Sequence, residues 1–573
     1  MINRTRPKRF DGLALAGAAL LLAACGSGSG GNSAPAGTQP PEAGAYNVNP
    51  VPRERLRDGG VFTWPLNQIL PNFNYYQIDG TLQDNAYVMF ALMPTAFNID
   101  DAAIAVWNPN LLAAEPVLEM EPKQVVTYEI NPEAAWYDGT PITWEDFHWQ
   151  WRASNGTDED YIIGSSNGYE AIESVERGTH DREVIVTFAD PFADWQSIFL
   201  PVYPASTNRS PEIFNEGWKD RPLTTAGPFK VDDINRTTQT ITLVPNEKWW
   251  GNPPKLDRIV FRAIDVSAQI DALANGEIDA MDIGPDANQY RRALGIAGIE
   301  IRSAGGPNFR HLTINATTPV LSDVRVRRAL AMGIDREAIA RALLGPLGIA
   351  PQSLNNHIFM INQDGYRDNS GEIGRYDPEQ AARLLDEAGW ALENGVRRKD
   401  GVPLEISGVI PATVQASRQE MELIQNMLAQ IGVTLDIDTV PLNDFFDRYV
   451  TPGQFDFTIF SWMGTPFPIS SSKSIYAEPT RDSNGDLQIQ QNYSRVGSAA
   501  LDALYDQANG EFDRERAQEL ANEADTLIWQ SVHSLTLYQR PELIAVKQNL
   551  ANFGAFGLAT PWVYEDIGWV DAE

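Results

Sequence analysis

The spacing of apolar side chains predicts alternating strands and helices from Gly59 onward. Residues 259–262 are predicted to form a strand, 267–273 a short helix and 278–281 the next strand, which is the order of a βαβ unit. A chain built in this way is an α/β protein. Further strands are predicted where apolar and polar positions alternate after turn residues: 61–64, 124–130 and 183–188.

Helices dominate the predictions for the second half of the chain. Asp335 and Asp377 each precede a stretch with apolar residues at helical spacing, and their side chains can cap the first turn. Ser322 is expected to cap a further helix. Residues 421–431 carry the same spacing, and a last long helix is predicted from about residue 513 to 529.

Two α/β lobes are predicted. A crossover between them is expected near residues 303–309, which include Gly305-Gly306-Pro307, and a return near residues 533–538. Crossover strands of this kind can act as a hinge. The predicted boundaries are 58–304 for lobe I, 305–532 for lobe II and 533–573 for the return to lobe I.

The amino terminus has the features of an export signal. A basic start within residues 4–9 precedes an apolar run from Gly12 to Ala24. The run is too short to span about 30 Å of hydrocarbon as a helix. We therefore expect residues 1–24 to be a signal peptide.

The string Leu22-Ala23-Ala24-Cys25 resembles the bacterial lipobox, in which the cysteine is acylated and becomes the first mature residue. The resemblance implies that Cys25 anchors the protein through lipid to the extracytoplasmic face of the cell membrane. An ordinary signal peptide with a chance cysteine is the alternative. Residues 26–44 are rich in Gly, Ser, Ala and Pro, so residues 25–57 are expected to form a flexible tether.

Composition narrows the possible functions. The 573 residues include 44 basic and 76 acidic side chains, for a net charge of -32. Such a chain lacks the Lys and Arg clusters that nucleic-acid phosphates require. The single cysteine cannot form an intramolecular disulfide. The five histidines are not closely paired, so a metal site is not expected. No P-loop or Rossmann string appears, and no cofactor is expected.

Several short strings occur in a fixed order along the chain. They read WYDGTPITWEDF at residues 136–147, AGPFK at 226–230, NEKWWG at 246–251, GEIDA at 276–280, DVRVRRAL at 323–330 and YDP at 376–378. In order and spacing they resemble the signature strings of the family 5 extracellular solute-binding proteins of bacterial ABC importers, the oligopeptide- and dipeptide-binding group. The resemblance covers nearly all of residues 58–573.

The resemblance implies a two-lobe periplasmic-binding-protein fold of class II, cluster C, with an extra subdomain inserted in lobe I at about residues 85–205. It also implies that an oligopeptide or similar bulky solute is captured between the lobes and delivered to an ABC permease. We expect a monomer that is not an enzyme and has no catalytic residues. The string G-x-S-x-G at residues 164–168 fits an esterase elbow, but it falls inside the insert and is set aside.

A second function remains open on the same scaffold. The chain also resembles non-transport envelope lipoproteins of mycobacteria that act in the assembly of cell-wall glycolipids. A cleft sealed between two lobes favours the importer function, and a permanently open, apolar groove favours the glycolipid function.

Trp462 is the leading candidate for a ligand-binding residue. In peptide-binding members of the family, a Trp is followed three residues later by an Asp whose carboxylate pairs with the peptide ammonium. Here Thr465 stands at that place, and a neutral hydroxyl cannot supply the counter-charge. Either another acid takes over, or the solute lacks a free amino terminus. Phe467 lies in the same segment and is included in the expected site.

Two further segments are expected to reach the ligand because of their position. Phe73, Asn74 and Tyr75 combine aromatic and amide side chains after the first strand, a mixture that concave sites use. Asn308 and Phe309 lie at the predicted crossover and are expected to face the cleft.

Overall fold

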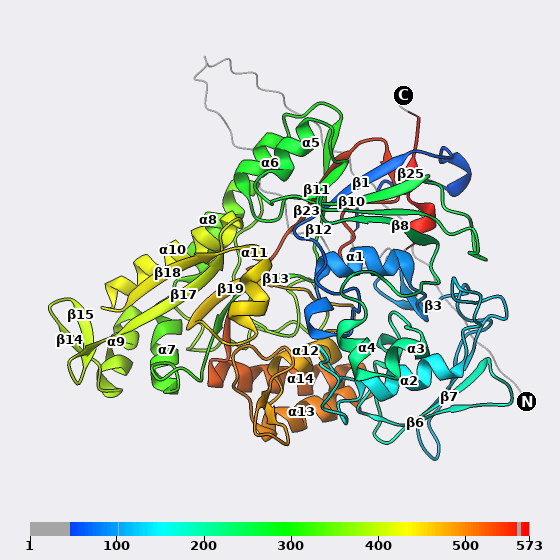
Figure 1. Ribbon diagram of the computed structural model, residues 1–573. Helices are drawn as coiled ribbons and strands as arrows, with labels where there is room; N and C mark the ends of the chain where they lie inside the picture. Colours follow the sequence, from blue (N-terminus) through cyan, green and yellow to red (C-terminus); the bar gives the residue numbers. More distant parts are fainter. Residues whose placement is uncertain (1–45, 101, 559–562, 572–573) are drawn as a thin grey trace, which may run out of the picture. The chain divides into compact units, whose positions relative to one another are not determined.

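The computed structural model describes residues 46–100, 102–558 and 563–571 (Figure 1). The predicted signal peptide, residues 1–24, and the acylation site Cys25 lie outside the described residues. Within the described part of the chain, no helix is both long and apolar enough to cross a membrane.

Lobe I is built around two sheets. The first has the order β1 (Val61–Leu66), β10 (Arg258–Ala263), β9 (Thr240–Pro245) and β8 (Phe229–Asn235). In it, β1 runs parallel to β10, and the other neighbours are antiparallel. The second sheet is antiparallel and has the order β11 (Ala280–Asp282), β23 (Glu542–Lys547) and β12 (Ile299–Ala304). Its central strand therefore comes from the end of the chain.

The predicted βαβ unit is present in sequence order but not within one sheet. Strand β10, helix α5 (Gln269–Ala274) and strand β11 follow one another, yet β10 and β11 belong to different sheets. Asp279 joins the two sheets: its amide N donates to Thr63 O (2.9 Å), and its Oδ2 accepts from Thr63 N (2.6 Å). The Asp279 carboxylate thus takes the place of a backbone carbonyl in the pairing with Thr63. The spacing of apolar residues along the chain gives no sign of such a contact.

The inserted subdomain carries a four-stranded antiparallel sheet. Its order is β4 (Val117–Glu119), β5 (Val125–Glu129), β7 (Glu183–Phe188) and β6 (Ile172–Arg177). Helix α2 (Trp144–Ser154) packs against β6 and β7 and begins with a capping box formed by Thr143 and Asp146. One buried apolar cluster includes both Phe62 of β1 and Val126 of β5, so the subdomain shares its core with lobe I.

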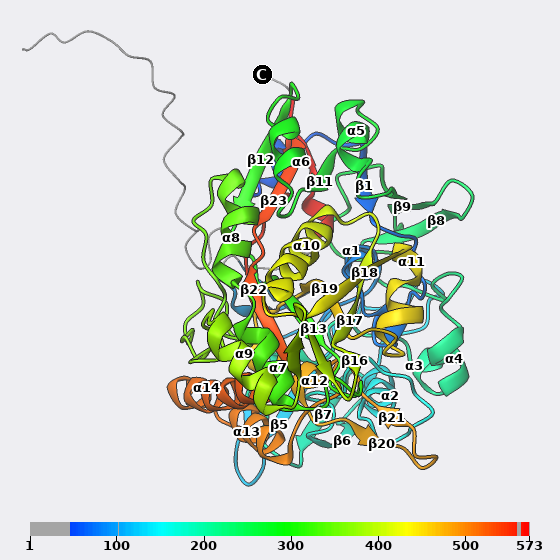
Figure 2. The same ribbon diagram turned by 90° about the vertical axis from the view of Figure 1, so that its left-hand side faces the viewer.

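Lobe II is organised around one five-stranded sheet (Figure 2). Its order is β18 (Thr434–Val440), β17 (Glu405–Pro411), β19 (Phe457–Trp462), β13 (Phe309–Ile314) and β22 (Ser534–Gln539). Helix α10 (Gln415–Gln430) packs against β17, β18 and β19. The apolar cluster of this lobe is separate from that of lobe I.

The other elements surround these sheets. Further helices are α1 (Gln83–Leu92), α3 (Ala205–Asn208), α4 (Pro211–Glu216), α6 (Ala287–Ala293), α7 (Val324–Met332), α8 (Arg336–Leu344), α9 (Pro378–Glu387), α11 (Leu442–Asp444), α12 (Pro468–Tyr476), α13 (Ala499–Asn509) and α14 (Arg514–Ser531). Single helical turns are η1 (Arg53–Arg55), η2 (Ile78–Gly80), η3 (Trp195–Ser197), η4 (Gly345–Leu347), η6 (Tyr564–Asp566) and the π-helical η5 (Phe445–Val450). Short strands are β2 (Phe97–Ile99), β3 (Ala105–Trp107), β14 (Ala391–Glu393), β15 (Val396–Lys399), β16 (Val402–Pro403), β20 (Thr480–Arg481), β21 (Leu487–Gln488), β24 (Leu550–Ala551) and β25 (Gly568–Trp569).

Two adjacent crossover segments join the lobes. Residues 305–308 lead from β12 to β13, and residues 540–541 lead from β22 to β23. Arg540 N donates to Asn308 O (2.8 Å), which ties the segments together. The return was predicted at residues 533–538, and this boundary is wrong. Those residues fall almost entirely in β22, which pairs with β13 and packs into the core of lobe II, so lobe II extends to about residue 539.

The end of the predicted tether is part of the folded body. Asn47 pairs with Ala555, and Arg57 pairs with Trp569, both in short antiparallel bridges. Arg53 forms an ion pair with Asp566 (2.5 Å). The prediction of a free segment up to residue 57 is therefore wrong for its last residues, because their partners lie some 500 positions away in the sequence.

The helix caps follow the predictions with one exception. The side chains of Asp335 and Asp377 cap α8 and α9 as predicted. The predicted cap Ser322 is wrong, because its hydroxyl donates to Pro319 O (3.0 Å). Asp323 accepts the first-turn amide of α7 instead, and a carboxylate at this end also suits the helix dipole.

Candidate functional site

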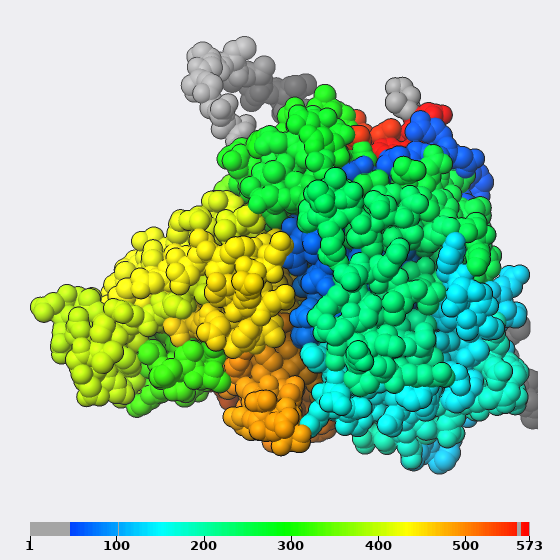
Figure 3. Space-filling model, viewed as in Figure 1, coloured from blue at the N-terminus to red at the C-terminus, as the bar shows by residue number. Residues whose placement is uncertain are grey.

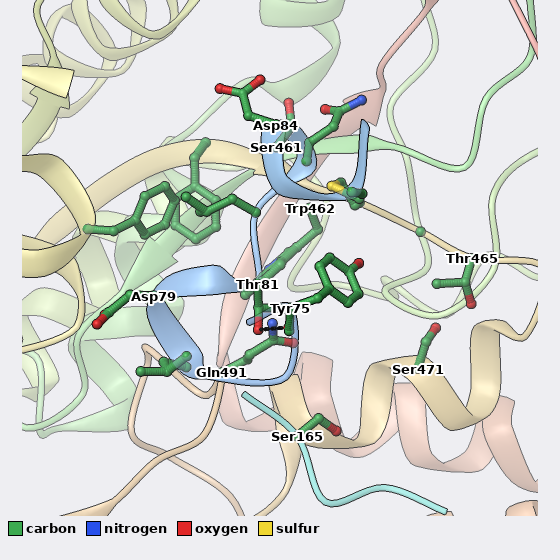
Figure 4. A pocket seen from close by; sticks show the side chains of 18 of the residues that line it. Tyr75, Asp79, Thr81, Asp84, Ser165, Ser461, Trp462, Thr465, Ser471 and Gln491 are labelled. Atoms are coloured by element: carbon green, nitrogen blue, oxygen red, sulfur yellow. Dashed lines mark hydrogen bonds between the residues drawn. The ribbon is translucent and has the colours of Figure 1, made fainter. Parts of the chain in front are cut away.

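A cavity of about 710 Å³ lies between the lobes. Its walls come from residues 67–99 of lobe I, from Ser165 and Asn167 of the inserted subdomain, and from residues 442–475 and 491–493 of lobe II. Figure 4 shows a close view of these walls. Pockets that bind small molecules typically measure about 300–1,000 Å³, so the cavity is large enough for a solute of that size.

Trp462 lines the cavity at the end of β19. Its ring stacks on Tyr493, with centroids 5.7 Å apart and planes 2° apart, and on His311, with centroids 5.6 Å apart. Stacking on two rings restricts the side-chain rotamer. The structure therefore presents Trp462 to a ligand as a fixed aromatic surface.

Thr465 and Phe467 also line the cavity, as expected. Thr465 Oγ1 accepts from Phe467 N (3.0 Å), which shapes the turn before α12. The hydroxyl thus has a structural partner and carries no charge. In Figure 4, Thr465 lies on the opposite side of the cavity from Asp79.

Only one of the three residues expected from the aromatic loop lines the cavity. Tyr75 does, and its amide N donates to the Tyr203 hydroxyl (2.9 Å). Phe73 is fully buried in the core of lobe I, and Asn74 is buried with its Nδ2 donating to Phe214 O (2.9 Å). The expectation that Phe73 and Asn74 face the ligand is wrong, because their side chains hold the loop in place.

The crossover residues Asn308 and Phe309 also lie outside this cavity. Asn308 Oδ1 accepts from Gly464 N (3.3 Å), so its side chain joins the crossover to the segment after β19. Phe309 is buried and lines a smaller neighbouring cavity together with Met360. Asn308 lies in the crossover segment and Phe309 begins β13, but neither residue faces the main cavity.

Two carboxylates that no sequence pattern singled out line the cavity from opposite lobes. Asp79 lies in η2 of lobe I, and Asp447 lies in η5 of lobe II. Asp79 Oδ2 accepts from Gln77 Nε2 (3.2 Å). Among the described residues, neither carboxylate lies within ion-pairing distance of a Lys, Arg or His side chain. Their approach depends on the tertiary fold, so spacing along the chain gives no signal for it.

The two carboxylates lie close to the stacked rings. Burial raises the pKa of Tyr493 to about 12, and the charges of Asp79 and Asp447 act in the same direction. Burial also raises the pKa of Asp447 above its ordinary value, and Asp79 adds to this shift by repulsion. The cavity therefore combines an aromatic surface with two carboxylates that form no direct ion pair, although the charges of Lys219 and Arg448 partly offset that of Asp447.

The other charged groups on the wall have partners within the protein. Arg236 donates to Lys219 O (2.7 Å) and lies 3.7 Å from the Asp220 carboxylate. Arg310 donates from Nε to Glu420 Oε1 (3.0 Å), and both side chains are buried. Asp84 Oδ2 accepts from the backbone amides of Asn67 (3.0 Å) and Gln68 (3.2 Å), and burial raises the pKa of Asp84 to about 7. Asp79 and Asp447 are thus the wall groups best placed to attract a positive ligand.

The G-x-S-x-G string has a structural role. Residues 164–168 form a loop, not a strand followed by a helix. Ser166 Oγ donates to Glu170 Oε2 (2.7 Å) and accepts from Gln490 Nε2 (3.0 Å) of lobe II. Within the described residues, no group of three or more His, Cys, Asp or Glu side chains is arranged to hold a metal ion.

Comparison with known proteins agrees with this geometry. The family described as "Bacterial extracellular solute-binding proteins, family 5 Middle" matches residues 108–484. The oligopeptide-binding protein OppA of Mycobacterium tuberculosis is 42% identical over 517 residues, which cover 90% of this chain and 85% of OppA. The probable monoacyl phosphatidylinositol tetramannoside-binding protein LpqW of the same species is 27% identical over 283 residues, which cover 48% of this chain and 44% of LpqW.

The fold is shared with a solved structure over nearly the whole of both chains. The periplasmic EDTA-binding protein EppA superposes with a TM-score of 0.80 at 26% identity, over 92% of this chain and 98% of EppA. The predicted two-lobe periplasmic-binding-protein fold is confirmed. On the family match and the OppA identity together, the chain belongs to the bacterial extracellular solute-binding proteins of family 5.

Proposed function

We propose that this chain captures oligopeptides between its lobes and delivers them to an ABC permease. The observation that carries the proposal is the cavity that both lobes line, with the stacked Trp462 and Tyr493 on its wall. The 42% identity to an oligopeptide-binding protein supports the same solute class. A ligand that contacts both lobes favours the closed arrangement, because it binds that state more tightly than the open one.

Asp79 and Asp447 bind the positive group of the peptide. A desolvated ammonium needs a counter-charge, and Thr465 has none. The two unpaired carboxylates supply it, and the neighbouring aromatic rings suit a cation as well. Because the two acids belong to different lobes, an ammonium between them also draws the lobes together. Peptides with a free amino terminus or a basic side chain are therefore the preferred solutes.

Calorimetry with matched peptides tests this assignment. A peptide without basic side chains is compared with its N-acetylated form. We expect acetylation to weaken binding at least about tenfold, which corresponds to about 1.4 kcal/mol of binding free energy. The control is the C-amidated peptide, which keeps the ammonium and should bind within about twofold of the parent. Equal affinity of the free and acetylated peptides contradicts the role of the two acids.

Cys25 carries the lipid anchor in this proposal. A Cys25→Ser variant loses the only thiol of the chain and thus the acylation site. We expect the wild type in the membrane fraction and labelled by a fatty-acid probe, and the variant released and unlabelled. A wild-type protein that takes up no fatty acid contradicts the anchor and leaves solute capture untouched.

A second candidate function is the handling of a mannosylated lipid in the cell envelope. The 27% identity to LpqW over about half of this chain favours it. A melting-temperature screen with peptides and phosphatidylinositol mannosides separates the two candidates, because a bound solute stabilises the folded state. Stabilisation by the mannosides alone favours the second function.

A further inference from the structure

A second set of contacts joins the inserted subdomain to lobe II, separate from the two crossover segments. We call this set the clasp and define it by six residues: Asn167, Glu170 and Ala193 of the subdomain, and Ser470, Lys473 and Asn509 of lobe II. Figure 3 shows the cyan surface of the subdomain against the orange surface of lobe II at this place.

Asn167 bonds to lobe II with both ends of its amide. Its Nδ2 donates to Ser470 O (2.5 Å), and its Oδ1 accepts from Asn509 Nδ2 (3.2 Å). Beside it, Ala193 N donates to Asn509 O (2.6 Å). Ser470 and Asn509 are both buried, so separation of the lobes would expose and unpair these groups.

Lys473 pairs with one carboxylate on each side of the contact. On its own lobe it reaches Asp506 of α13 (2.8 Å), and across the contact it pairs with Glu170. The Lys473 side chain is only 16% exposed. Burial opposes its charge, yet the two carboxylates together raise the pKa of Lys473 above its ordinary value. Opening would remove Glu170 and leave the Asp506 pair intact.

All of these contacts form between protein groups, without any ligand atom. The closed arrangement therefore has a stabilisation of its own. We propose that the clasp keeps a fraction of the molecules closed before a solute arrives, and that it scales the affinity for every solute by the same factor. Only the closed form offers both walls of the cavity, so the apparent dissociation constant varies inversely with the closed fraction. The statement on affinity rests on the proposed capture of peptides.

Substitutions at Glu170 test the clasp without touching the cavity wall. Glu170→Gln removes the charge, and Glu170→Lys places a like charge against Lys473. The matched control is Asp506→Asn, which removes the other partner of Lys473 within lobe II. Neither Glu170 nor Asp506 lines the cavity. Single-molecule energy transfer between one dye on each lobe reports the closed fraction without solute.

We expect the effect to grow with the change of charge at residue 170. The ligand-free closed population falls in Glu170→Gln and falls further in Glu170→Lys, whereas Asp506→Asn stays close to wild type. Calorimetry with two unrelated peptides should show the same loss of affinity for both, about threefold for Glu170→Gln and about tenfold for Glu170→Lys.

Three results would overturn the clasp: an unchanged closed population in Glu170→Lys, an equal loss in Asp506→Asn, or losses of affinity that differ between the two peptides. If the wild type binds no peptide, the proposed function fails, and the energy-transfer measurement still decides whether the clasp holds the lobes.

Discussion

At the residue scale, Asp79 and Asp447 are the proposed partners of the positive group of the solute. We expect Asp79→Asn and Asp447→Asn each to weaken binding of a free peptide about tenfold and to leave its acetylated form unchanged. The control is Asp444→Asn, since Asp444 neighbours Asp447 but pairs with Arg448 and does not line the cavity. Calorimetry on the three variants checks this, and equal losses for free and acetylated peptides would contradict it.

Mild acid should weaken the same interaction. The pKa of Asp447 lies above the ordinary value of 3.8, because burial and the charges of Asp79 and Asp444 raise it more than the charges of Lys219 and Arg448 lower it. The Asp447 carboxylate is charged above that pKa and becomes neutral as the pH falls through it. The affinity for a peptide with a free amino terminus should therefore decrease as the pH is lowered. A titration of affinity against pH with the acetylated peptide should stay flat. Parallel curves for the two peptides would argue against a charged anchor.

Trp462 should matter for every peptide, whatever its charge. Trp462→Ala removes an aromatic surface that is fixed by Tyr493 and His311, and buried Trp residues in interfaces often contribute about 2 kcal/mol or more. We expect a loss of affinity of about thirtyfold or more for free and acetylated peptides alike. Trp249→Ala is the control, because Trp249 packs against Trp250 with the two rings tilted and does not line the cavity.

The segment between β19 and α12 allows a test at the scale of an element. Thr465→Asp introduces an acid at the place where the resemblance to peptide-binding members implies one, and a carboxylate near the start of α12 suits the helix dipole. Because Thr465 and Asp79 lie on opposite sides of the cavity, we expect less than about a twofold gain for a free peptide. A gain of about tenfold would place the peptide ammonium at position 465 instead.

Local sequence patterns predicted the helices, strands and caps themselves better than they predicted which strands pair with one another. The strand 183–188 and the caps of α8 and α9 depend on neighbouring residues, and the structure has them as predicted. The placement of β10 and β11 in different sheets depends on the pairing of β11 with β23, and the extent of lobe II depends on the pairing of β22 with β13. Neither partner is visible in local periodicity.

The cavity residues show the same difference between what a local segment reveals and what only the folded chain reveals. Trp462, Thr465 and Phe467 were found because their segment resembles a family motif, and all three line the cavity. Phe73 and Asn74 were selected by residue type, but the same chemistry serves to hold a loop. Asp79 and Asp447 come from separate lobes, so only the folded arrangement brings them to one cavity.

Buried carboxyl groups should make the whole molecule more stable in mild acid. Burial raises the pKa of Asp146 to about 6 and of Asp84, Glu542 and Glu565 to about 7. The folded protein thus binds protons more tightly than the unfolded chain, whose carboxyls titrate near about pH 4. This stabilisation is full below about pH 4 and is lost as the pH rises to about 7.

Differential scanning calorimetry should therefore show a higher melting temperature at about pH 5 than at about pH 8. Glu542→Gln should flatten the dependence, since it removes one of the groups responsible. A melting temperature that is highest at about pH 8 would contradict the assignment of these groups.

The clasp and the crossover segments both join the lobes, so solute capture is a property of the entire molecule. Native mass spectrometry of the protein purified without denaturation tests that property most directly, with Trp462→Ala measured in parallel. We predict bound oligopeptides with free amino termini on the wild type and their loss from the variant. A wild-type protein that carries no peptide and takes up none from a mixed pool, or that carries a glycolipid instead, would contradict the proposed function.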